Sequence, residues 1–167
     1  MKRSEINHEM KNAMELFIEN NFFLPKFSTW GPEEWNKKGP KIREIIEHQL
    51  GWDITDYGSG DFSRMGLIHF TIRNGSPSRE TKDYCEKIMI QKEGQWGPTH
   101  FHHEKIEDII NRGGGTLMVQ VHEATSENDL ASTNVSVSLD GTRHEVEAGH
   151  IFELEPGHSI TLMPRIF

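Results

Sequence analysis

The sequence has little cysteine, few positive charges relative to negative ones and no long apolar run, and each shortage excludes a class of protein. Cys85 is the only cysteine in 167 residues, which excludes an internal disulfide, and we expect Cys85 to be a small buried residue. The 18 Lys and Arg against 26 Asp and Glu give a formal net charge of −8. This disfavours a nucleic-acid partner, which is bound by clustered positive charge. No stretch approaches the ~18 apolar residues of a membrane span, so we predict no membrane partner.

Length and composition predict a globular chain with a core of its own. A chain of 167 residues is long enough to bury close to ~70% of its unfolded surface in one domain. The nine Phe and four Trp supply bulky core material. The first eight residues lack the apolar stretch of a signal peptide, and with a single cysteine this predicts a cytoplasmic protein.

The first third of the chain is predicted to be helical. Ser4 can cap a helix that runs to about Asn20, because apolar residues recur on one face of it. A second helix is predicted from Pro40, a residue suited to a first turn, to the stop at Gly51. The apolar residues of the first helix that should face the core are Ile6, Met10, Met14 and Phe17.

After Gly66 the apolar period changes to two residues, which is typical of strands. Asp140 and Gly141 lie between two strand-like runs and predict a two-residue hairpin, since both tolerate positive φ. Many short strands with turn residues between them predict a sandwich or barrel. The eight predicted strands are residues 66–73, 84–91, 99–102, 116–123, 135–139, 143–147, 150–154 and 159–163.

Two histidines and one carboxylate are spaced like metal ligands. Successive side chains of a strand alternate between its faces, so His100 and His102 would project the same way, roughly 6.5 Å apart. Glu107 follows after a short polar interval in which the chain can turn back. Imidazole with carboxylate suits Mn, Fe, Zn, Co or Ni, whereas the simplest alternative is an exposed His pair without a ligand. His103 alternates to the opposite face and is predicted to be exposed or to support the ligands from outside.

The spacing of Gly94, His100, His102, Glu107 and Gly114 resembles the first conserved motif of the cupin superfamily. Within that superfamily the chain resembles the bacterial D-lyxose isomerases along nearly its whole length, at residues 24–25, 51–60, 70–75, 86–90, 100–102, 107–115 and 159–162. The resemblance implies a mainly β fold, a cupin double-stranded β-helix (jelly-roll) barrel with N-terminal α-helices. Residues 1–60 would be a helical segment packed on the barrel, and residues 61–167 the barrel itself.

The resemblance also implies a chemistry. The protein would be a sugar isomerase that interconverts D-lyxose and D-xylulose, with D-mannose and D-fructose as further substrates, through an enediol. His100, His102 and Glu107 would be three of four ligands to a divalent ion, commonly Mn²⁺, with Zn²⁺, Co²⁺, Fe²⁺ or Ni²⁺ as alternatives. Lys105 would face the monosaccharide as polariser or acid; the alternative for Lys105 is a solvated salt bridge to Glu104 or Glu107. By analogy with other cupins we expect a homodimer.

The last residues depart from the family pattern. Where relatives read Pro-Gly-x-Tyr-His, with the histidine as fourth ligand, this chain reads Met163, Pro164, Arg165, Ile166 and Phe167. We therefore expect a chain shortened at its C-terminus, with the last strands of the barrel missing. His150 and His158 do not align with the missing ligand. Two other functions stay open: a cupin oxygenase with non-haem iron, and a sugar-binding or structural cupin with impaired chemistry.

Overall fold

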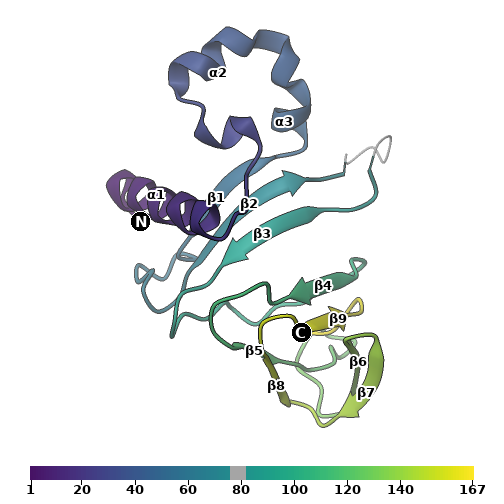
Figure 1. Ribbon diagram of the computed structural model, residues 1–167. Helices are drawn as coiled ribbons and strands as arrows, with labels where there is room; N and C mark the ends of the chain where they lie inside the picture. The colour runs from purple at the N-terminus through teal and green to yellow at the C-terminus, as the bar shows by residue number, and fades with distance from the viewer. Residues whose placement is uncertain (76–81) are drawn as a thin grey trace. The chain divides into compact units, whose positions relative to one another are not determined.

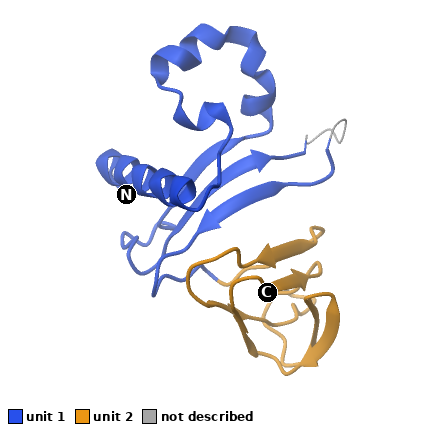
Figure 2. Cartoon of the chain, in the orientation of Figure 1, with its two compact units in different colours: residues 1–98 blue, residues 99–167 orange. Residues whose placement is uncertain are grey.

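The computed structural model describes residues 1–75 and 82–167 and is mainly β, with antiparallel sheets. The chain forms two compact units, residues 1–98 (unit 1) and residues 99–167 (unit 2) (Figure 2). The elements of unit 1 are α1 (Arg3–Glu19), η1 (Lys26–Thr29), α2 (Pro32–Lys38), η2 (Gly39–Ile42), α3 (Arg43–Glu47), β1 (Gly51–Thr55), β2 (Leu67–Arg73) and β3 (Glu86–Ile90). Those of unit 2 are β4 (Glu107–Ile110), β5 (Leu117–Gln120), β6 (Val135–Leu139), β7 (Thr142–Val146), β8 (Ile151–Leu154) and β9 (Ser159–Leu162).

In unit 1 the helix α1 lies along an antiparallel sheet of order β1-β2-β3 (Figure 1). Ala13 and Phe17 of α1 are buried with Ile68 of β2. Of the four residues predicted to face the core, Phe17 is buried, whereas Ile6, Met10 and Met14 are half-buried. The start is different from the prediction, because Lys2 takes the N-cap position and the Glu5 carboxylate accepts the Lys2 N–H, which leaves Ser4 inside the helix.

The second predicted helix is present as two short pieces, η2 and α3, which end before Gly51. The sequence did not predict α2, because Gly31 and Pro32 are residue types that commonly end helices. Pro32 instead occupies the first helical position, where its missing N–H costs nothing. The Glu34 carboxylate accepts the Gly31 N–H at 3.1 Å and completes this start.

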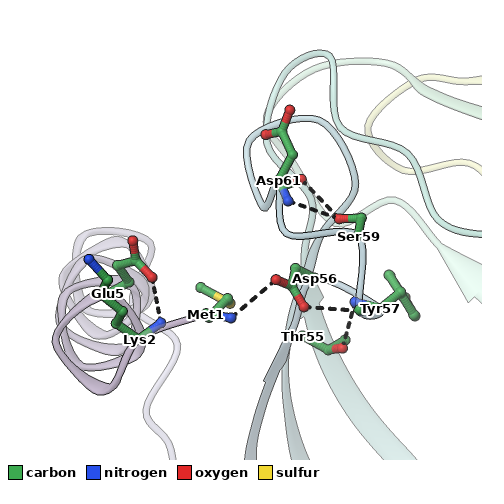
Figure 3. Close-up of polar contacts among 9 residues, drawn as sticks. Met1, Lys2, Glu5, Thr55, Asp56, Tyr57, Ser59 and Asp61 are labelled. Carbon is green, nitrogen blue, oxygen red and sulfur yellow. Dashed lines mark hydrogen bonds and ion pairs between the residues drawn. The ribbon is translucent and has the colours of Figure 1, made fainter.

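The turn after β1 is held by a carboxylate and a hydroxyl (Figure 3). Asp56 accepts the Gly58 N–H at 3.1 Å and lies 3.2 Å from the Met1 amino group, and Thr55 Oγ1 accepts the Tyr57 N–H at 2.9 Å. The hydrogen bond from Gly58, and next to it the Met1 ammonium, hold the pKa of Asp56 below its ordinary value. Both interactions favour the ionised carboxylate in the folded state.

Unit 2 is built from three antiparallel pairs nested inside one another. Along the sequence, the β6–β7 hairpin is flanked by β5 and β8, which pair with each other, and these are flanked by β4 and β9, which also pair. A further pairing of β6 with β9 gives one sheet of order β4-β9-β6-β7, and β5-β8 forms the second sheet. One core of apolar side chains from both sheets fills unit 2: Val121, Val135, Val137, Phe152, Leu154, Ile160, Leu162 and Ile166.

Most predicted strands are confirmed. The hairpin prediction is confirmed as well, with Asp140 at φ 50° and Gly141 at φ 78° between β6 and β7. The sequence missed β1 and β4, which are five and four residues long. Closure of the two sheets into a barrel stays a prediction.

Three other expectations can be compared with the described residues. Cys85 is exposed, so its predicted burial is wrong; it lies just before β3 rather than within it. In the described ranges no helix is both long and apolar enough to cross a membrane. The division of the chain into residues 1–60 and 61–167 stays a prediction, beside an observed pair of compact units that divides after residue 98.

Candidate metal centre

The segment that carries both histidines lies at the beginning of unit 2 and is irregular. Residues 99–106 form no strand, so the prediction of a strand over residues 99–102 is wrong. The backbone is held instead by the other end of unit 2, where the Arg165 N–H donates to the His102 carbonyl at 2.8 Å. This bond fixes one point of the segment but imposes no alternation of faces.

Aromatic contacts fasten the same segment. The Phe101 ring lies 4.7 Å from the Phe167 ring, centroid to centroid, and the Arg165 guanidinium lies 5.3 Å from the Phe101 centroid. The His103 ring also packs on Phe101, with the two ring centroids 4.8 Å apart. His103 is exposed, as predicted. Sequence reasoning did not find the role of Arg165 and Phe167, although it did note that this end of the chain departs from the family pattern.

Glu107 is positioned by regular structure. It is the first residue of β4, paired with Leu162 of β9. Side chains two residues apart share a face of a strand, so Glu107 shares its face with Ile109, which packs against the core of unit 2. The carboxylate therefore lies at the margin of the inner face, where its side chain keeps 29% of its exposure.

Two side chains converge beside this carboxylate. Lys105 Nζ lies 2.7 Å from Glu107 Oε1 and 3.2 Å from His102 Nε2. His102 Nε2 lies 3.6 Å from Glu107 Oε2. The ammonium thus bridges two of the three predicted metal ligands, and the salt bridge that the sequence offered as the alternative for Lys105 is present.

His100 is next to this cluster. Its ring lies 5.3 Å from that of His102, at an interplanar angle of 87°, and the residue is exposed. Across the part of the chain that the structure describes, no three His, Cys, Asp or Glu side chains are gathered as a cation site. Two predicted ligands converge and the third is their neighbour, so a centre that uses all three stays a prediction.

The residues present nevertheless fit a divalent ion in their chemistry. Two imidazoles and a carboxylate are the donors that Mn²⁺, Fe²⁺ and Zn²⁺ accept. The Lys105 ammonium is itself a cation, and it contacts both His102 and Glu107. This part of the protein therefore already attracts positive charge to the point where two of the three donors meet.

Comparison with known proteins gives the class first. The sequence profile described as D-lyxose isomerase matches residues 1–167. A relative from Serratia proteamaculans named D-lyxose/D-mannose isomerase is 44% identical over 170 residues, and one of the same name from Escherichia coli O157:H7 is 39% identical. Each match covers 100% of this chain and 75% of the relative. The chain is an enzyme of the sugar isomerase class.

Within that class the assignment is specific. The chain belongs to the D-lyxose isomerase family.

Proposed function

We propose that the protein interconverts D-lyxose and D-xylulose, with D-mannose and D-fructose as a second pair, through an enediol. The observation that carries the proposal is the cluster of His102, Lys105 and Glu107 in a chain that belongs to this family. Both relatives are named for D-lyxose and D-mannose. Moving a hydrogen between C1 and C2 of such a sugar needs a held carbonyl and a group that transfers a proton.

In this proposal His100, His102 and Glu107 hold a divalent ion, with Mn²⁺ as the first candidate. Such an ion, when bound, polarises a carbonyl and offsets negative charge that develops on oxygen. Glu107 contributes the anionic donor, and its place at the start of β4 fixes its direction. His102 contributes Nε2, whose lone pair is available to a cation in the neutral tautomer protonated at Nδ1.

Lys105 is the proposed catalytic residue. Its ammonium has three N–H donors and, at 44% side-chain exposure, reaches solvent as well as Glu107. It can donate a hydrogen bond, or a proton, to a sugar oxygen beside the metal ligands. General acid help of this kind typically contributes about 10²–10⁴-fold to the rate.

One observation favours a second function. In the described residues the three ligands are not gathered into one set, which is the arrangement expected of a family member that binds a sugar without turning it over. The two functions differ in turnover, since both predict that monosaccharide binds.

The test is a ketose assay on purified protein with D-lyxose and Mn²⁺, run with Glu107→Gln and Asp108→Asn. Asp108 is the matched control, because it is the adjacent carboxylate and bonds Thr161 Oγ1, away from Glu107. We expect ketose from the unaltered protein and from Asp108→Asn, and a loss of at least about 10²-fold in Glu107→Gln.

Bound D-lyxose without ketose formation in the unaltered protein would instead support the sugar-binding function. Equal turnover by Glu107→Gln and the unaltered protein would contradict the proposed centre.

A further inference from the structure

We infer that the Lys105 ammonium occupies the cation position between His102 and Glu107 in the metal-free protein and leaves both side chains when a divalent ion binds. The inference rests on the proposed metal centre and concerns a step before catalysis. Loading of the ion and release of Lys105 toward the sugar are then one event.

The two cations compete for the same atoms. Lys105 Nζ lies 3.2 Å from His102 Nε2, and a neutral imidazole has a single lone pair at that nitrogen. A hydrogen bond from the ammonium and a bond to a metal therefore exclude each other at Nε2. At Glu107 the ammonium lies 2.7 Å from Oε1, and its positive charge beside the carboxylate also opposes the approach of a second cation.

The position of Lys105 allows the exchange. Lys105 lies in the irregular segment of residues 99–106, and its side chain keeps 44% of its exposure. An exposed ion pair of this kind shifts a population by a factor of about 1.5 to 5. Lys105 therefore lowers the affinity for the ion by reducing the fraction of protein whose ligands are open, but it does not block the ligands.

The chain offers a matched control in unit 1. Lys92 Nζ lies 2.6 Å from Glu9 Oε2, so Lys92 is also a lysine paired with a glutamate, outside the proposed centre. Removing the charge of Lys92 tests whether any lost ammonium would change metal binding.

The first experiment is calorimetric titration of Mn²⁺ into the metal-free protein and into its Lys105→Met and Lys92→Met variants. We expect Lys105→Met to bind Mn²⁺ about 1.5- to 5-fold more tightly, and Lys92→Met to bind it as the unaltered protein does. Equal or weaker binding by Lys105→Met overturns the inference while leaving the metal centre standing. Absence of Mn²⁺ binding in all three proteins overturns the inference together with the centre.

The second experiment needs no substitution. Acetylation of individual lysines is followed by mass spectrometry with and without Mn²⁺. We expect Lys105 to be acetylated at least about twofold faster with Mn²⁺, because the ammonium loses both partners, and Lys92 to react at an unchanged rate. A Lys105 rate that stays the same or falls in the presence of bound Mn²⁺ overturns the inference, because it shows that the amine has not been released.

Discussion

At the scale of single residues, Asn111 shapes the turn that follows β4. It is 7% exposed, and its Nδ2 donates at 2.8 Å to the carbonyls of both Gly115 and Leu154. Its Oδ1 accepts the Gly113 N–H at 3.1 Å. One amide therefore satisfies polar groups of two separate segments, and its bond to the Leu154 carbonyl is buried.

We predict that Asn111→Ala lowers the free energy of unfolding by about 1–3 kcal/mol, because it leaves the buried Leu154 carbonyl without its donor. Urea denaturation measures the change. Asn134→Ala, at an exposed position of the same unit, is the control and should change stability by less than about 0.5 kcal/mol. Equal effects of the two substitutions would contradict the role of Asn111.

The residues of the candidate site were predictable to different degrees. Spacing placed His102 and Glu107 near each other, because they are neighbours along the chain. Spacing could not find Arg165 and Phe167, since their contacts with residues 101–102 join the two ends of unit 2. The glycines at 113–115 are typical of a reversal, but the buried hydrogen bond of Asn111 that holds it depends on Leu154, far along the sequence.

At the scale of elements, the β6–β7 hairpin is tied to β9 through its turn. Asp140 Oδ1 accepts the Ser159 N–H at 2.7 Å and the Ser159 hydroxyl at 3.1 Å. The bond from the Ser159 backbone is the main cause that holds the pKa of Asp140 below its ordinary value of 3.8. Because the ionised form is favoured by folding, this contribution to stability is complete at neutral pH and decreases as the pH falls through and below that value.

We predict that Asp140→Asn makes unfolding less sensitive to acid. Asparagine tolerates the positive φ of this position, so the turn is kept while the titrating group is removed. The measurement is urea denaturation at pH 7 and at about pH 3: the stability lost between the two should be smaller in Asp140→Asn. Ser159→Ala keeps the backbone donor and should retain most of the loss, whereas an unchanged pH dependence in Asp140→Asn would refute the assignment.

Elements with a strong local pattern were predicted well, and weak or short ones were not. The β6–β7 hairpin has alternating apolar residues and a turn sequence with a conformational requirement, so both the strands and the connection followed from the sequence. The strand β4 begins with Glu107 and Asp108 and becomes a strand through pairing with β9. Residues 99–102 were expected to form a strand, but they pair with no neighbouring strand. Contacts with residues 165–167 hold this segment instead.

At the scale of the whole molecule, sheet edges predict association. In the described part of unit 2, β4 and β7 are the edge strands of the larger sheet. An edge strand presents backbone N–H and C=O groups that can pair with a second chain. The sequence predicted a homodimer by analogy, and these edge strands are where we expect the second chain to bind.

We predict that light scattering after gel filtration gives a mass twice the 19.2 kDa of one chain. Substituting Glu145→Pro in β7 removes a backbone N–H that the hairpin register directs away from β6, and it should increase the monomer fraction if this strand forms the contact. The control is Thr161→Val in the interior strand β9, which should leave the mass unchanged. A mass of 19.2 kDa at all concentrations would contradict the dimer.

The nested pairing of unit 2 has a consequence for the order of folding. The hairpin around Asp140 and Gly141 closes a loop of a few residues, which costs the least chain entropy of the three pairs. Once it has formed, β5 and β8 are joined through a preformed hairpin rather than through a long open chain, and β4 and β9 gain in the same way from them. We therefore expect the start of β4 to pair last, so that Glu107 reaches its final direction only after the rest of unit 2 has assembled.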